Sequence, residues 1–157
     1  MPSRGMFYEG FFVGQNFQLP AFGVFPEEIA DFSRLTRDDN PLHGEDEAFH
    51  AERNLIFKKR VVHGMLTMSR LMGALHEAGI ISGTCVAFAE ASQKFLRPVL
   101  PGDEVTTLVT VVAKDDIPED DRLGFVTFSA TASKLGKPVL VATLKIVVVR
   151  KKPGLSK

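Results

Sequence analysis

Apolar and polar residues alternate most regularly in the last third of the chain. From Val126 to Ser133 apolar and hydroxyl side chains alternate, and a second alternating run extends from Leu140 to Val148. Alternation with a period of two is the signature of a strand with one buried face. Because Leu135-Gly136-Lys137-Pro138 separates the two runs, the pattern predicts a tight turn and a β-hairpin.

A helical spacing of apolar residues occurs twice in the first half of the chain. The longer segment begins at Gly64 and meets a glycine stop at Gly79, which predicts a helix over about 64–78. Its apolar residues share one face: Met65, Met68, Met72 and Leu75. A shorter helix is predicted from about Pro26 to Leu35, where a proline and two acidic residues open an amphipathic stretch.

The remaining segments complete a single α+β domain over residues 1–157. Apolar runs near 86–95 and 105–112 predict two more strands. The segment 7–25, rich in phenylalanine and glycine, predicts short extended pieces joined by turns. Segment 36–60 is predicted to be mostly loop, and 115–122 a solvated acidic turn, since it lacks the ligand spacing of a calcium loop. Four sequential antiparallel strands are then expected to pack around the long helix.

Composition narrows the classes of function. The 157 residues are 45% hydrophobic, and 19 basic residues balance 19 acidic ones, so the chain lacks the net field that nucleic-acid or membrane binding exploits. It contains no run of about 20 apolar residues and no signal-peptide core. The single cysteine, Cys85, excludes an internal disulfide and a cysteine-built zinc site. We therefore expect a cytoplasmic protein with no nucleic-acid or membrane partner.

The segment Asp38-Asp39-Asn40-Pro41-Leu42-His43 carries the most specific chemistry. A carboxylate and an imidazole on either side of an Asn-Pro turn can both be aimed inward. Converging on one water, Asp38 and His43 could take a proton from it and deliver another to a substrate, while Asn40 orients it. A capping or turn role for Asp38 and an ordinary loop position for His43 explain the same residues from sequence alone.

A second candidate site lies where the long helix begins, in Val62-His63-Gly64-Met65. The first N–H groups of a helix have no internal partner and lie at the positive end of its dipole. The amide of Gly64 or Met65 could therefore hold a carbonyl oxygen that gains negative charge during a reaction. A glycine needed only for the turn into the helix is an equally good explanation.

Together these two segments resemble the MaoC-like (R)-specific enoyl-CoA hydratases. The resemblance rests on Asp38-x-Asn40-Pro41-x-His43, then His63-Gly64-Met65-Leu66, then Phe95-x-x-Pro98-Val99-x-Pro101-Gly102-Asp103. It runs from about Ile29 through Val105, and the strand pattern to Val149 is compatible with it.

The resemblance implies a single hot-dog domain, in which an antiparallel sheet wraps a long central helix, and a homodimer or a dimer-based oligomer. It implies that Asp38 and His43 are the catalytic pair, that Asn40 helps to bind the water, and that the Gly64 amide is an oxyanion donor. His63 becomes a supporting residue behind the site. The implied reaction is reversible syn addition of water to a trans-2-enoyl-CoA, giving an (R)-3-hydroxyacyl-CoA, with acyl carrier protein as another possible carrier and with no cofactor or metal.

Some positions depart from the family pattern. Arg37 stands where family members usually have glycine, and Glu45 stands where they often have aspartate. Arg37 could reshape the loop, contact a coenzyme A phosphate or point into solvent. The basic run Lys58-Lys59-Arg60, like Lys94 and Arg97, could attract those phosphates or form a solvated face.

Two other functions fit the same fold. A hot-dog acyl-CoA thioesterase would direct the water at the thioester carbon, but such enzymes commonly carry their acid on the long helix, where this chain has only Glu77. A non-catalytic acyl-CoA binding module would have no need of Asp38 and His43 together.

Overall fold

The computed structural model describes residues 5–151, and its main element is one antiparallel sheet of five strands. The strands are β1 (Asn16–Phe22), β2 (Cys85–Phe95), β3 (Val105–Asp116), β4 (Leu123–Lys134) and β5 (Lys137–Val149). Their order across the sheet is β1-β3-β4-β5-β2. Strands β3, β4 and β5 are therefore central, and β1 and β2 form the two edges.

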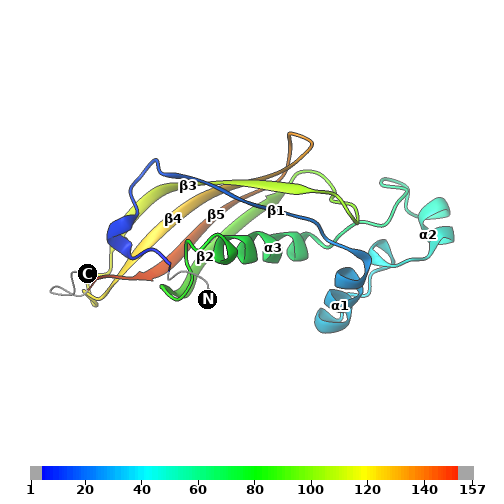
Figure 1. The fold of residues 1–157 in the computed structure, drawn as a ribbon. Coiled ribbons are helices and arrows are strands. Elements are labelled where there is room, and N and C mark those ends of the chain that lie inside the picture. Colours follow the sequence, from blue (N-terminus) through cyan, green and yellow to red (C-terminus); the bar gives the residue numbers. More distant parts are fainter. Residues whose placement is uncertain (1–4, 152–157) are drawn as a thin grey trace.

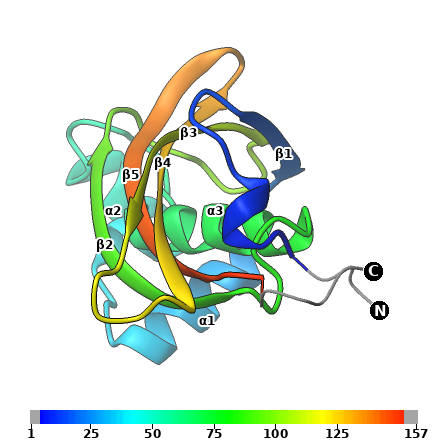
Figure 2. The same ribbon diagram turned by 90° about the vertical axis from the view of Figure 1, so that its left-hand side faces the viewer.

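The longest helix, α3 (Gly64–Glu77), runs along the concave side of this sheet. Viewed end-on, the sheet curls around α3 (Figure 2), which confirms the expected α+β hot-dog architecture. Helices α1 (Pro26–Thr36) and α2 (Glu47–Glu52) lie together beyond one end of the sheet (Figure 1). Two short 3-10 helices complete the fold, η1 (Tyr8–Gly10) and η2 (Pro41–His43).

The core lies between α3 and the inner face of the sheet. In β4 every second residue from Gly124 to Ala132 is buried, as the period-two pattern predicts, and the same alternation occurs in β3 from Val105 to Val111. Leu135 and Gly136 both have positive φ angles, 49° and 72°, at the turn between β4 and β5, so the predicted hairpin is confirmed. The buried residues of α3 share one face: Leu66, Thr67, Met68, Leu71, Ala74 and Leu75.

Several sequence predictions need correction. The segment 36–60 is mostly loop, as predicted, but it also contains η2 and α2, and Asp46 caps α2 by accepting a hydrogen bond from the Phe49 N–H at 3.0 Å. The predicted acidic turn is shorter than 115–122, because β3 continues through Asp116, whose carboxylate pairs with Arg150. Met65 is half exposed and Leu35 is 80% exposed, so neither belongs to the buried face of its helix.

Strand β2 differs from the other strands in its exposure. Its apolar run predicts a strand, which the structure confirms, but Val86 and Phe88 are 55% and 46% exposed, and most of its residues are exposed. The reason is its position: among residues 5–151, β2 pairs only with β5 and forms an edge of the sheet. Among residues 5–151, no helix has the length and apolar character required to cross a membrane.

Candidate active site

A cavity of about 440 Å³ lies where the α1–η2 segment meets the start of α3. Its polar lining brings together the residues that the sequence singles out: Asp38, His43, His63 and Gly64. Its apolar walls come from the segment before α3, from α3 itself and from the end of β2, and they include Phe57, Met65, Phe95 and Leu96. Together with Val139 and Leu140 of β5, four segments far apart in the sequence form one partly apolar pocket with a few polar groups, which is typical of a small-molecule site.

Asp38 is placed by the way α1 ends. Arg37, the residue after α1, adopts the left-handed conformation (φ 61°, ψ 21°), and this turns the chain so that Asp38 follows at the cavity. The left-handed region favours glycine, which explains the glycine that the resembling family usually has here. The Arg37 side chain is exposed, and that of Asp38 is 53% exposed.

His43 is the last residue of η2, and a cap and a main-chain contact fix its orientation. Asn40 caps η2, since its Oδ1 accepts a hydrogen bond from the Leu42 N–H at 3.0 Å. The Nδ1 of His43 lies 2.8 Å from the Val61 carbonyl oxygen. A carbonyl only accepts, so Nδ1 carries the proton and a neutral His43 keeps its lone pair on Nε2. Asn40 is not among the residues that line the cavity.

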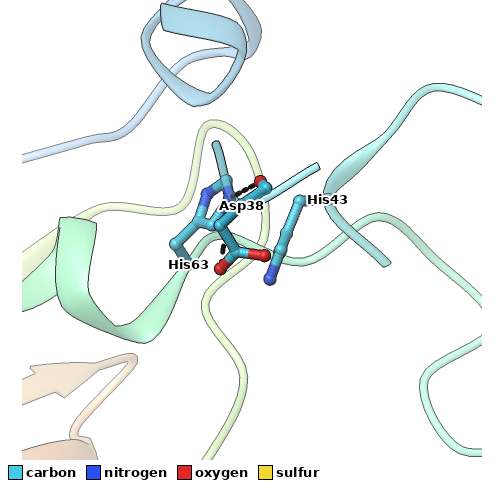
Figure 3. Close-up of side chains that lie close together, drawn as sticks. All are labelled: Asp38, His43 and His63. Atoms are coloured by element: carbon cyan, nitrogen blue, oxygen red, sulfur yellow. Dashed lines mark hydrogen bonds and ion pairs between the residues drawn. The ribbon is translucent and has the colours of Figure 1, made fainter. Parts of the chain in front are cut away.

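His63 lies directly behind this pair and is only 3% exposed. Its ring stacks on that of His43, with centroids 3.7 Å apart and an interplanar angle of 27°. Its Nε2 is 3.1 Å from the main-chain oxygen of Asp38 and 4.0 Å from the Asp38 carboxylate. The three side chains point toward one another (Figure 3). Burial lowers the pKa of His63 below 6.5, and the neighbouring His43 lowers it further.

Gly64 begins α3, and no side chain caps the helix at this end. The first N–H groups of any helix have no intrahelical partner, and here no side chain of the described residues occupies them. Gly64 itself lines the cavity. A Cβ at this position would lie 2.9 Å from Cε1 of Phe95. Glycine is required here because the Phe95 ring packs against the helix start.

Arg60 makes contacts that the basic run in the sequence does not reveal. Its Nε donates to the main-chain oxygen of His43 at 2.7 Å, and its Nη1 lies 3.0 Å from the Glu45 carboxylate. The guanidinium thus ties the end of η2 to the segment before α3. Lys58 and Lys59 are exposed, whereas the Arg60 side chain is only 14% exposed, so the run is not one solvated face. These contacts span 15 and 17 residues and leave no local signal.

The ligand atoms of Asp38, His43 and His63 all lie within 4.8 Å of one another, a composition that could hold a metal ion. The hydrogen bonds of these side chains do not favour a metal site. The Nε2 of His63 faces the Asp38 carbonyl, to which it donates, so its lone pair is not directed at the shared space. The arrangement therefore fits a hydrogen-bonded group for proton transfer better than a set of metal ligands.

Comparison with known proteins places this site in a family. Residues 12–139 match the model of the MaoC like domain. The (R)-specific enoyl-CoA hydratase of Rhodospirillum rubrum is 33% identical over 143 residues, covering 90% of this chain and 91% of that protein. The (R)-specific enoyl-CoA hydratase of Aeromonas caviae is 40% identical over 108 residues, covering 68% and 75%.

A solved structure agrees with these relatives. The MaoC-like dehydratase from Rhodospirillum rubrum superposes with a TM-score of 0.81 at 26% identity, covering 94% of this chain and 99% of that one. The family match spans Asp38, His43, His63 and Gly64, which the fold brings to one cavity. The chain therefore belongs to the MaoC-like domain family and is an enzyme of the hydro-lyase class.

Proposed function

We propose that the chain is an (R)-specific enoyl-CoA hydratase, which adds water reversibly to a trans-2-enoyl-CoA to give an (R)-3-hydroxyacyl-CoA. The observation that supports this best is the meeting of Asp38, His43 and the Gly64 amide at one cavity. Relatives named for this activity, at 33% and 40% identity, support the same substrate class. The catalytic residues are Asp38 and His43, and Gly64 is the oxyanion donor.

The reaction uses the two sides of the cavity differently. The thioester carbonyl accepts a hydrogen bond from the Gly64 N–H at the positive end of α3, which stabilises the enolate charge that forms on its oxygen. This polarisation makes Cβ electrophilic. A water held by the Asp38 carboxylate and by the lone pair on His43 Nε2 adds its oxygen to Cβ as one of its protons passes to the pair.

The same pair then supplies a proton to Cα. Because Asp38 and His43 lie on one side of the substrate, oxygen and hydrogen reach the same face of the double bond, which is syn addition. The two groups act as one coupled unit in which the proton taken and the proton given balance over each turnover. Asn40 does not line the cavity, so we assign it to holding the η2 turn that carries His43, through its bond to the Leu42 N–H.

We also propose that the chain works as a homodimer of single MaoC-like domains. Residues near both ends of the described range, 5–151, belong to one sheet and one core, which supports a single domain. Within the described part of the chain, the outer edge of β2 has no partner strand, and β2 carries the exposed Val86 and Phe88. Pairing of β2 with its counterpart in a second copy would satisfy that edge and cover these side chains.

The test is turnover of crotonyl-CoA by the purified protein. We expect loss of the absorbance of the conjugated enoyl thioester, no release of free thiol, and (R)-3-hydroxybutyryl-CoA as the product. Asp38→Asn should lower the rate by about 10² to 10⁴-fold, whereas the matched control Asp39→Asn, at an exposed neighbouring position, should keep it.

Other results would reassign the function. Release of free thiol by the wild-type protein would indicate thioester hydrolysis. No turnover of short or long enoyl chains, on coenzyme A or on acyl carrier protein, would leave an acyl-CoA binding module. Equal loss of activity in Asp38→Asn and Asp39→Asn would remove Asp38 from its catalytic role.

A further inference from the structure

His63 contacts both members of the catalytic pair and precedes the oxyanion donor in the chain. It meets Asp38 through the main chain, with Nε2 3.1 Å from the carbonyl oxygen, and it meets His43 through the ring face at a centroid distance of 3.7 Å. Gly64 is the next residue.

The ring of His63 is fixed from more than one side. The Phe32 ring of α1 lies 5.0 Å away at an angle of 58°, and Ser33 Oγ lies 3.2 Å from Nε2. Together with His43 on its stacked face, these contacts leave the side chain only 3% exposed. Because the His63 ring is packed tightly against these side chains, a displacement of His63 would also displace its neighbours.

We propose that His63 is a positioning residue that acts as a neutral imidazole with its proton on Nε2, holding Asp38 and His43 in register with the Gly64 amide. This inference rests on the proposed hydratase function. His63 is assigned no proton transfer to the substrate. Its two separable contributions are the hydrogen bond to the Asp38 carbonyl and the stacked support of the His43 ring.

The hydrogen bonds define the protonation state. The Asp38 carbonyl accepts, so Nε2 must carry a proton. Nδ1 is buried and has no hydrogen-bond partner among the described residues. A proton added at Nδ1 would be a buried donor without an acceptor, on a cation stacked against His43, and both effects disfavour it. The charged and titratable groups facing His63 are Asp38, His43 and Arg60.

Two variants separate the contributions of His63. His63→Gln keeps an N–H donor at about the reach of Nε2 and removes the ring. His63→Phe keeps a flat ring for stacking and removes the donor. We expect each variant to lower kcat for crotonyl-CoA by about 10 to 100-fold with KM changed less than about threefold, because a displaced catalytic pair slows the chemical step more than binding.

The pH profile gives a readout that a purely structural role would not change. Protonation of His63 adds a positive charge beside the catalytic pair, so the acid limb of kcat/KM below pH 6.5, where the lowered pKa of His63 lies, should be steeper in the wild type. The limb of His63→Phe should keep a one-proton slope. Equal slopes in the two proteins would overturn the proposed coupling.

Nitrogen-15 NMR of the histidine rings tests the same inference without turnover. We expect a neutral His63 with its proton on Nε2 at pH 7, and His43 ring resonances that move in both variants because the stacked contact changes. A proton on Nδ1 of His63, or kcat within about threefold of the wild type in both variants, would overturn the proposal. If the wild type turns over no enoyl thioester, the hydratase function fails, and the NMR result still decides whether His63 positions the pair. Thermal unfolding identifies a variant that fails to fold, in which case the other variant and the wild-type spectrum decide.

Discussion

At the scale of single residues, Arg37 adopts a backbone conformation that favours glycine. Its φ of 61° and ψ of 21° lie in the left-handed region, which costs a non-glycine residue about 1 kcal/mol. We therefore expect Arg37→Gly to raise the free energy of unfolding by about 0.5 to 1 kcal/mol, partly offset by the greater freedom of the unfolded chain. Urea unfolding measures the change. Arg34→Gly, an exposed position inside α1, is the control and should lose about 1 kcal/mol; a loss in both variants would contradict the argument.

Gly64 shows how a single hydrogen atom in place of a methyl group keeps the site open. A Cβ there would lie 2.9 Å from the Phe95 ring, so Gly64→Ala must displace either the ring or the start of α3. We expect kcat/KM to fall about 10-fold or more, because the oxyanion donor moves away from the carbonyl oxygen.

The double variant Gly64→Ala with Phe95→Leu tests this cause. Removing the ring should restore part of the activity lost in Gly64→Ala, measured as a double-mutant cycle on kcat/KM. Strictly additive losses would show that the Phe95 ring is not the obstacle.

At the scale of elements, Arg60 joins η2 and the starts of α1 and α3. Its Nε donates to the His43 carbonyl at 2.7 Å, and its Nη2 lies 3.4 Å from the Pro26 carbonyl. A lysine at this position carries the charge but lacks the planar fork. We expect Arg60→Lys to lower kcat about 10-fold with little change in unfolding temperature, because His43 loses its main-chain restraint. Lys59→Met, which removes an exposed charge next to it, should leave kcat unchanged; equal losses would point to charge rather than restraint.

The elements also show what a sequence can and cannot predict. The hairpin of β4 and β5 was predictable, because alternation and a Gly-Lys-Pro turn are local signals. Helix α2 had a local signal in Asp46, but six residues of mixed charge have little periodicity. The sequence motifs identified Asp38, His43 and Gly64 as site residues. They could not predict the stacking of His43 on His63, because these rings lie 20 positions apart in the sequence and meet only in the folded chain. The exposure of β2 depends on what lies beside its free edge, which its own sequence does not encode.

At the scale of the whole molecule, the free edge of β2 predicts how copies associate. Phe88 is 46% exposed on β2, whose outer edge has no partner strand among residues 5–151. If β2 pairs with β2 of a second copy, Phe88→Lys places like charges at the new interface and should shift the protein from dimer to monomer in sedimentation. Leu135→Lys is the matched control, because Leu135 is 93% exposed at the hairpin turn between β4 and β5. Dissociation in both variants, or in neither, would place the interface elsewhere.

Burial of His63 couples the catalytic site to the stability of the molecule. Its pKa in the folded protein lies below the ordinary 6.5, first because of burial, so the unfolded chain binds a proton more readily. Well above pH 6.5 neither state is protonated at His63, and the residue adds no pH dependence. As the pH falls below 6.5 the unfolded state gains the proton first, and stability should decrease by at most about 1.4 kcal/mol per pH unit until the folded pKa is reached.

Urea midpoints of the wild type and His63→Gln between pH 8 and pH 5 measure this difference. The stability advantage of the wild type should shrink toward pH 5, because only the wild type must bury an ionisable ring, and a difference independent of pH would show that His63 titrates alike in the folded and unfolded states.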